Sequence, residues 1–195
     1  MTVNLDPASP SSQDEPEPAS PCDDPPERAL SNNELSVGVA LSPKVSHRVD
    51  SSGIAWIIEH ARLAGRELKL AGEMRVRVID DAEMSKLHEE HLGDASTTDV
   101  MTFDLANGAA AEGKPMDADA HVCVDEATRR ASELGHPVER ELLLYVVHAM
   151  LHCVGHDDHD DDSYARMHAF EDEILERIGV GRTFAVGNRD SEAKP

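Results

Sequence analysis

This 195-residue sequence has few aromatic side chains, few cysteines and no long apolar run. Phe, Trp and Tyr together make up 3% of the residues, so the core must be built from aliphatic side chains. No stretch of about eighteen apolar residues occurs, which excludes a transmembrane helix. The hydrophobic content of 39% is still enough for one sizeable core, which excludes a wholly disordered chain.

The cysteines also exclude a disulfide-rich secreted domain. Cys22, Cys123 and Cys153 are odd in number and scattered along the chain. The first residues are acidic and proline-rich, without the basic and apolar segments of a secretory signal. These observations favour a reducing, cytoplasmic location.

Basic residues are scarce, since 18 Lys and Arg face 39 Asp and Glu, for a formal net charge of -21. Such a chain is a poor binder of polyanions unless the acids are segregated from the working surface. Residues 1–34 hold seven prolines, eight acids and one basic residue, Arg28, and so contribute -7 of this charge. Their composition predicts a disordered tail. We expect one folded domain over residues 35–184 and a short disordered tail over residues 185–195.

Hydrophobic periodicity predicts four strands and five helices within that domain. Their order indicates an α+β fold, a single domain with a mixed sheet of about four strands packed with helices. Ser51 or Ser52 is expected to cap the first helix. Gly135 is expected to end the third helix, and Pro137 suits the first turn of the fourth. The expected strands are 35–41, 73–79, 99–103 and 118–124, and the expected helices begin near residues 51, 80, 125, 137 and 162, with a loop over 105–116.

A histidine-rich stretch follows the fourth predicted helix and suggests a metal site. His148 and His152 are four residues apart, so they share one face of an otherwise apolar helix and could coordinate one ion. Gly155 allows the chain to reverse, which brings the next residues back toward the two imidazoles. Three protein ligands with an open fourth position are typical of a catalytic zinc.

The third ligand has two candidates. Spacing favours Asp158, whose carboxylate is an acceptable zinc ligand, whereas ligand frequency favours His159. His156 lies too early in the turn and is a weaker candidate. A zinc peptidase of the H-E-x-x-H kind would need a glutamate directly after His148, where this chain has Ala149, and this argues against peptidase chemistry.

Four stretches of this sequence together resemble the YbeY endoribonucleases, also called rRNA maturation factors. The run from His148 to Asp158 is similar to that family's H-G-x-L-H-L-x-G-Y-D-H signature. Residues 87–103, ending Thr-Thr-Asp-Val-Met-Thr-Phe, are similar to its L-N-x-x-[YF]-R and P-T-D-V-L-S-F segments. Residues 119–124 and 140–142 resemble its G-D-I-x-I strand and its R-E-x segment.

The resemblance implies an α+β fold and one zinc ion per chain, held by His148, His152 and Asp158, with His148 also carrying catalysis. It implies hydrolysis of single-stranded RNA, with a role in maturing the 3′ end of small-subunit rRNA and in ribosome quality control. The implied partners are rRNA precursor and the small ribosomal subunit, with neither DNA nor membrane. Asp158 departs from the family's usual third histidine.

Two further departures concern the phosphate-binding group. Leu92 stands where the family has an arginine used for activity, and His88 replaces an asparagine. Arg75 and Arg77, on one strand face, could follow an RNA backbone or could simply face solvent. The alternatives that remain are a ribosome-assembly binding factor with little nuclease activity, favoured by Leu92 and the acidity, and a metal-dependent hydrolase of another substrate.

Overall fold

The computed structural model describes residues 34–183. The predicted tails, residues 1–34 and 185–195, lie outside the described residues except for Glu34, so their disorder stays a prediction. Cys22 also lies outside. Cys123 and Cys153 are buried free thiols, and burial raises the pKa of each to about 11.

The described chain forms one four-stranded mixed sheet and five α-helices, which confirms the predicted α+β class. Most elements begin and end within two residues of the predicted positions. In chain order the elements are β1 (Leu35–Leu41), η1 (Pro43–Val45), α1 (Ser51–Glu67), β2 (Gly72–Ile79), α2 (Asp81–Leu92), β3 (Val100–Asp104), η2 (Ala109–Glu112), β4 (Met116–Cys123), α3 (Val124–Leu134), α4 (Val138–Cys153) and α5 (Asp161–Arg177).

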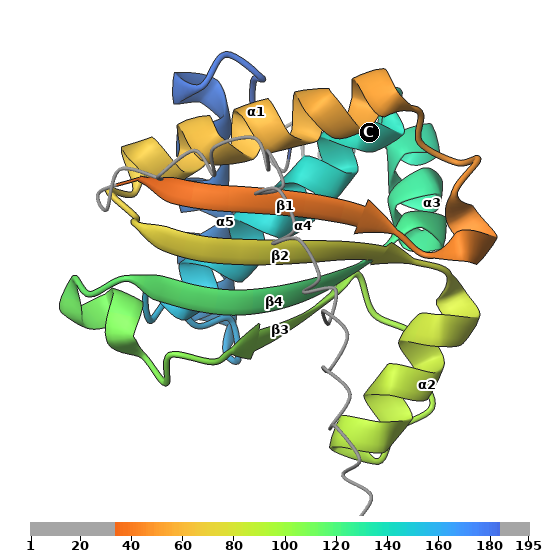
Figure 1. Cartoon of the computed structure of the whole chain (residues 1–195), viewed down its shortest axis with the longest axis horizontal. Coiled ribbons are helices and arrows are strands. Elements are labelled where there is room, and N and C mark those ends of the chain that lie inside the picture. The colour runs from red at the N-terminus through yellow and green to blue at the C-terminus, as the bar shows by residue number, and fades with distance from the viewer. Residues whose placement is uncertain (1–33, 184–195) are drawn as a thin grey trace, which may run out of the picture.

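The strands are arranged in the order β1-β2-β4-β3 (Figure 1). β1, β2 and β4 are parallel, and β3 runs antiparallel to β4 at the edge. Leu35 lies opposite Gly72, and Gly72 lies opposite Met116, so the three parallel strands start in register. The carboxyl ends of β1, β2 and β4 therefore lie together at the same end of the sheet, where β4 passes directly into α3.

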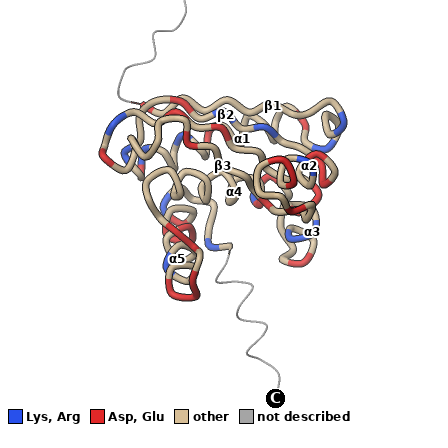
Figure 2. Tube along the Cα trace, turned by 90° about the horizontal axis from the view of Figure 1, so that it is seen from below, with Lys and Arg blue, Asp and Glu red and all other residues tan. Residues whose placement is uncertain are grey.

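Helix α4 lies at the centre of the helical layer on one face of the sheet (Figures 1 and 2). It contacts α1, α3 and α5, and it packs on β3 and β4. The alternation of β2 places Met74, Val76 and Val78 in the core against these helices. Because α4 is covered on most sides, eleven of its sixteen residues are buried. Any polar group on α4 is thus held in a largely dry, rigid setting.

Helix α2 covers one end of the opposite face. Its Met84 is fully buried beside Ile79, Met101 and Cys123, which form a second, smaller cluster. None of the helices in residues 34–183 is both long and apolar enough to cross a membrane.

The structure corrects three local expectations. Asp50, rather than Ser51 or Ser52, caps α1, since its carboxylate accepts from the Gly53 N–H at 2.8 Å. Ser52 does not cap the helix, because its hydroxyl donates to this same carboxylate at 2.6 Å. Pro137 is the residue before α4 rather than part of its first turn. The predicted loop 105–116 contains η2, and β4 already begins at its end.

The face of β2 that carries Arg75 and Arg77 was predicted to be basic, but carboxylates offset the charge of Arg75. Arg75 is surrounded by carboxylates: its Nε donates to Asp119 at 2.6 Å, and its guanidinium also meets Asp117 at 2.6 Å and Glu73 at 3.1 Å. Asp117 and Asp119 reach Arg75 because β4 pairs in parallel with β2. An RNA backbone would therefore find little net attraction on this face.

Candidate metal centre

The last two turns of α4 carry His148 and His152 on one face. The i,i+4 spacing brings their rings together edge to face, with centroids 4.6 Å apart. His148 is 9% exposed, and His152 is half-buried. The rest of this helix end is apolar, so the two imidazoles lie in surroundings that disfavour unpaired polar groups.

A glycine turn ends α4 and reverses the chain. Gly155 adopts φ +90°, a conformation that other residues rarely take. The N–H of His156 then donates back to the Leu151 carbonyl at 3.0 Å, which closes the turn. Further along, Asp160 and Ser163 form a reciprocal cap on α5. The loop between these two fixed points carries Asp158 back over the end of α4.

Three ligand atoms converge at this point. The Nε2 atoms of His148 and His152 lie 3.0 Å apart. The Asp158 carboxylate lies 3.5 Å from Nε2 of His148 and 3.8 Å from Nε2 of His152. Ligands that each sit 2.0–2.1 Å from a tetrahedral zinc are separated by roughly 3.4 Å. The spacing of the three side chains thus fits one ion of this size.

The outer nitrogen of each imidazole already has an acceptor. Nδ1 of His148 lies 2.6 Å from Oε1 of Glu171, and Nδ1 of His152 lies 3.1 Å from the His156 carbonyl oxygen. A carboxylate and a carbonyl only accept, so both Nδ1 atoms carry the protons. When both rings are neutral, the two Nε2 atoms face each other with lone pairs, as two imidazole ligands of one cation do. The donor set thus fits a metal ion.

Glu171 is the part of the centre that the sequence did not reveal. It comes from α5, is fully buried, and binds His148 through one oxygen and Nδ1 of His168 through the other, at 2.6 Å each. A carboxylate behind a ligating histidine fixes its tautomer and orientation. Apolar periodicity along α5 could show that Glu171 faces inward but could not show which residue it meets.

The electrostatics follow from this arrangement. Burial alone would raise the pKa of Glu171, but hydrogen bonds from His148 and His168 outweigh it and hold the pKa below its usual value. Burial alone would lower the pKa of His148, but Glu171, together with Asp99 and Asp158, raises it. Burial and the neighbouring His148 both lower the pKa of His152. Two adjacent imidazoles thus compete for positive charge, and His152 is the one that stays neutral.

The rival ligand His159 lies apart from the convergence point. Its side chain is largely exposed, and its Nδ1 pairs with the Asp157 carboxylate. That carboxylate raises the pKa of His159. His159 does share an exposed acidic cluster with Asp157 and Asp158. It therefore places an imidazole at the rim of the centre, beside the convergence point rather than in it.

Leu92, at the last position of α2, borders a cavity that reaches the same centre. The cavity measures about 540 Å³ and is also lined by His152, Asp158 and His159. Leu92 is 67% exposed and offers no charge. Among the residues lining this cavity, only histidines could supply a positive charge. His88 lies here as well, with its Nδ1 3.3 Å from the Ser96 hydroxyl.

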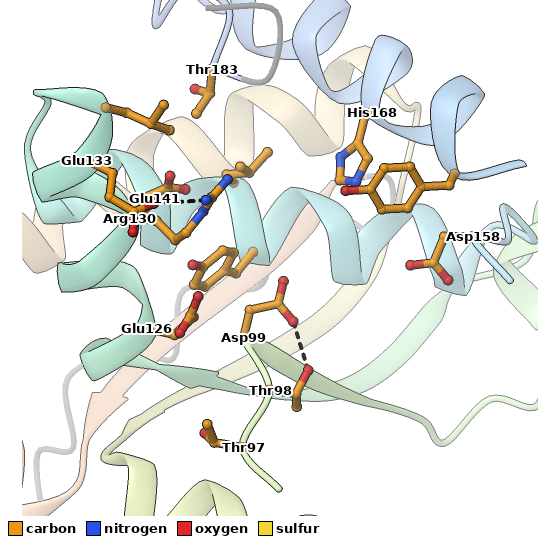
Figure 3. A pocket seen from close by; sticks show the side chains of 14 residues that line it. Thr97, Thr98, Asp99, Glu126, Arg130, Glu133, Glu141, Asp158, His168 and Thr183 are labelled. Atoms are coloured by element: carbon orange, nitrogen blue, oxygen red, sulfur yellow. Dashed lines mark hydrogen bonds and ion pairs between the residues drawn. The ribbon is translucent and has the colours of Figure 1, made fainter. Parts of the chain in front are cut away.

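A larger cavity of about 830 Å³ opens on the other side of Asp158 (Figure 3). Asp158 and His168 lie at one end, and Arg130, Glu133 and Glu141 lie at the other. Thr98 and Asp99, which precede β3, form part of its wall, with the Thr98 hydroxyl 3.0 Å from the Asp99 carboxylate. The centre thus lies between two cavities, both of which are lined by Asp158.

Comparison with known proteins identifies one family. The family described as Endoribonuclease YbeY matches residues 44–179. A protein of that name from Roseiflexus sp. (strain RS-1) is 32% identical over 159 residues, covering 78% of this chain and 99% of the relative. One from Symbiobacterium thermophilum is 36% identical over 133 residues, covering 62% of this chain and 85% of the relative.

A third protein of the same name, from Laribacter hongkongensis, is 31% identical over 150 residues and covers 75% of this chain and 90% of the relative. Among solved structures, the solution structure of a Thermotoga maritima protein matches 72% of this chain and 90% of its own, with 20% identity and a TM-score of 0.48.

Proposed function

Because this chain belongs to the YbeY endoribonuclease family, we propose that it is a zinc-dependent endoribonuclease that hydrolyses single-stranded RNA. Its proposed substrate is the precursor of small-subunit rRNA, near the 3′ end, and its proposed setting is ribosome maturation and quality control in the cytoplasm. The small ribosomal subunit is the proposed partner, and DNA is not a substrate.

One observation carries this proposal: two imidazole nitrogens and a carboxylate converge with their lone pairs toward one point. In the proposal, His148, His152 and Asp158 hold one zinc ion per chain. Such an ion, when bound, polarises a phosphoryl oxygen and activates a water molecule for attack on phosphorus. These residues leave the side facing the two cavities open, as a catalytic rather than a structural ion requires.

The side chains around the centre have distinct parts in the proposed reaction. His148 is the central ligand, because Glu171 fixes its ring from behind. His159, exposed at the rim with a raised pKa, can bring positive charge toward a phosphate oxygen, a part that Leu92 cannot fill. The buried wall formed by α4 and α5 restricts water on the far side of the centre.

The alternative function is an assembly factor that binds the small ribosomal subunit and cleaves little RNA. Leu92 supports it, because an exposed leucine lies where an arginine would contact phosphate. The surplus of carboxylates around Arg75 also supports it, because these carboxylates weaken binding to a polyanion.

Cleavage assays separate the two functions. Purified protein loaded with zinc should cleave a fluorescent single-stranded RNA, and it should leave the duplex form and the matching single-stranded DNA intact. His148→Ala should abolish cleavage, while His47→Ala, a histidine in the exposed turn before α1, should retain it. Binding to small subunits without cleavage of any RNA would favour the assembly factor.

A further inference from the structure

The larger cavity extends from the metal centre along one face of α4. Glu141, Tyr145 and His148 follow each other on that face at intervals of four and three residues, so they form a row that leads away from Asp158. The cavity volume of about 830 Å³ is ample for a nucleotide. A chain of RNA whose phosphate lies at the metal centre would extend a neighbouring nucleotide into this space.

The charge of this cavity selects against a phosphate. Its walls carry five carboxyl side chains and, among the residues that line it, one guanidinium, Arg130. Arg130 is itself paired with Glu133 at 2.9 Å. The carboxyl groups belong to Asp99, Glu126, Glu133, Glu141 and Asp158. Glu126 is paired with Arg129 at 2.7 Å, and an ion would neutralise Asp158 in the proposed site. Asp99 and Glu141 then leave the rest of the cavity with a net negative charge, which repels anions and attracts groups that donate hydrogen bonds.

Tyr145 contributes an unpaired hydroxyl to this cavity. The residue is 4% exposed, and its hydroxyl has no hydrogen-bond partner among the described residues. A buried hydroxyl without a partner destabilises the free protein, so such groups are uncommon unless a ligand satisfies them. The hydroxyl both donates and accepts, which suits a heterocyclic base.

Glu141 lies one helical turn before Tyr145 and is equally enclosed, with 2% exposure. Its carboxyl is 3.5 Å from Nε2 of His136, a separation too long for a good hydrogen bond. That imidazole nitrogen is also without a partner among the described residues. Burial raises the pKa of Glu141 to about 7. Of these two adjacent polar side chains on α4, Tyr145 thus has no hydrogen-bond partner among the described residues, and Glu141 has the 3.5 Å contact with His136.

We propose that this cavity is a base-reading subsite, which takes the nucleobase next to the scissile phosphate and selects a base with an exocyclic amino group. Tyr145 and Glu141 are its specificity-determining residues. The inference rests on the proposed endoribonuclease function and deepens it.

The preference follows from the edges of the bases. Adenine, cytosine and guanine each carry an amino group with two N–H donors, which carboxylates accept. Uracil instead presents one N–H between two carbonyl oxygens, and those oxygens are repelled by the carboxylate of Asp99 and, above about pH 7, by that of Glu141. Uracil is therefore the base that this subsite disfavours.

Sequencing the ends produced from a random single-stranded RNA tests the proposal. The zinc-loaded protein should deplete uracil about fivefold at one position beside the cut, the factor that one net hydrogen bond supplies. Tyr145→Phe should reduce the depletion below about twofold while leaving the melting temperature unchanged or higher, because it removes an unpaired hydroxyl. A purely structural role of Tyr145 would instead lower the melting temperature and leave the base preference unchanged.

A charge-matched pair completes the experiment. Glu141→Gln should weaken the preference, whereas Glu112→Gln should keep it, because Glu112 lies in η2, outside the cavity, paired with Lys114. Uniform base frequencies at every position near the cut would overturn the subsite while leaving the nuclease function intact.

If no RNA is cleaved, the proposed function has failed, and binding then decides the inference separately. Fluorescence anisotropy with short labelled oligomers of A, C and U should show weaker binding of the U oligomer by about fivefold. Tyr145→Phe should remove this difference. Equal binding of the three oligomers to the wild-type protein would overturn the subsite.

Discussion

The buried polar side chains at the two ends of α4 differ in their hydrogen-bond partners. At the carboxyl end, His148 and His152 each have an acceptor behind the ring, so only the two inner nitrogens lack one. In the first half of the helix, the Tyr145 hydroxyl has no partner among the described residues, and Glu141 has only the Nε2 of His136 at 3.5 Å. The same apolar helix therefore carries one region whose polar groups are held in place and one whose polar groups are weakly held.

The two buried glutamates make the contrast quantitative. Glu171 has two imidazole donors, which hold its pKa below the usual value despite complete burial. For Glu141 burial dominates, because its nearby cations are the more distant Arg130 and Arg140, and the pKa rises to about 7. The difference lies in hydrogen-bond partners rather than in depth.

The largest effect is expected from removing the proposed carboxylate ligand. Asp158→Ala should weaken zinc binding by more than about 100-fold, beyond the 10–100-fold typical of an outer partner. His159→Ala should weaken it by about tenfold or less. Competition with a chromogenic chelator measures both variants. The reverse order would show that His159 is the third ligand.

A smaller effect is expected from the residue behind His148. Glu171→Gln keeps the size of the side chain but removes its charge, so His148 loses a strong acceptor, and zinc affinity should fall about 10–100-fold. Glu173→Gln, on the exposed side of α5, is the matched control and should change it little. Equal affinities of the two variants would mean that Glu171 does not orient the ligand.

The pH dependence of stability tests the other end of α4. Between about pH 4.5 and pH 7, the folded protein keeps a proton on Glu141 that the unfolded chain has released, so this contribution to stability is lost as pH rises. Glu141→Gln has no such proton. Its free energy of unfolding relative to wild type should rise by about 2 kcal/mol from about pH 5 to about pH 8 in urea titrations. A constant difference would contradict the raised pKa.

The smallest effect concerns a helix cap remote from both regions. Asp50→Ala removes the carboxylate that caps α1 and should lower the free energy of unfolding by about 1 kcal/mol. Ser52→Ala should cost less, because the Ser52 hydroxyl bonds to that carboxylate rather than to the helix backbone. Zinc affinity should stay unchanged in both variants. A larger loss in Ser52→Ala would reverse the assignment of the cap.

Local signals made most of the fold predictable. Alternation in β2 identified its buried face, and Gly135, at φ +71°, ends α3 as expected. The convergence of His148, His152 and Asp158 was predictable for the same reason, since the i,i+4 pair and the turn at Gly155 are encoded within a dozen residues. That these side chains bind a metal stays a prediction.

Contacts between distant segments were not predictable in this way. Glu171 meets His148 across 23 residues and Asp119 meets Arg75 across 44, through helix packing in one case and strand pairing in the other. Hydrophobic periodicity shows which face of an element turns inward, but not which neighbour it meets. The cap at Asp50 was missed for a different reason, because Asp50, Ser51 and Ser52 are all good capping residues and the backbone decides between them.

Elemental analysis of protein purified without chelator tests the central claim most directly. The account predicts about one zinc per chain in the wild-type protein and almost none in His148→Ala, with both proteins folded by circular dichroism. A wild-type protein without zinc or another transition metal, or equal zinc in the two proteins, would contradict a metal centre at the end of α4.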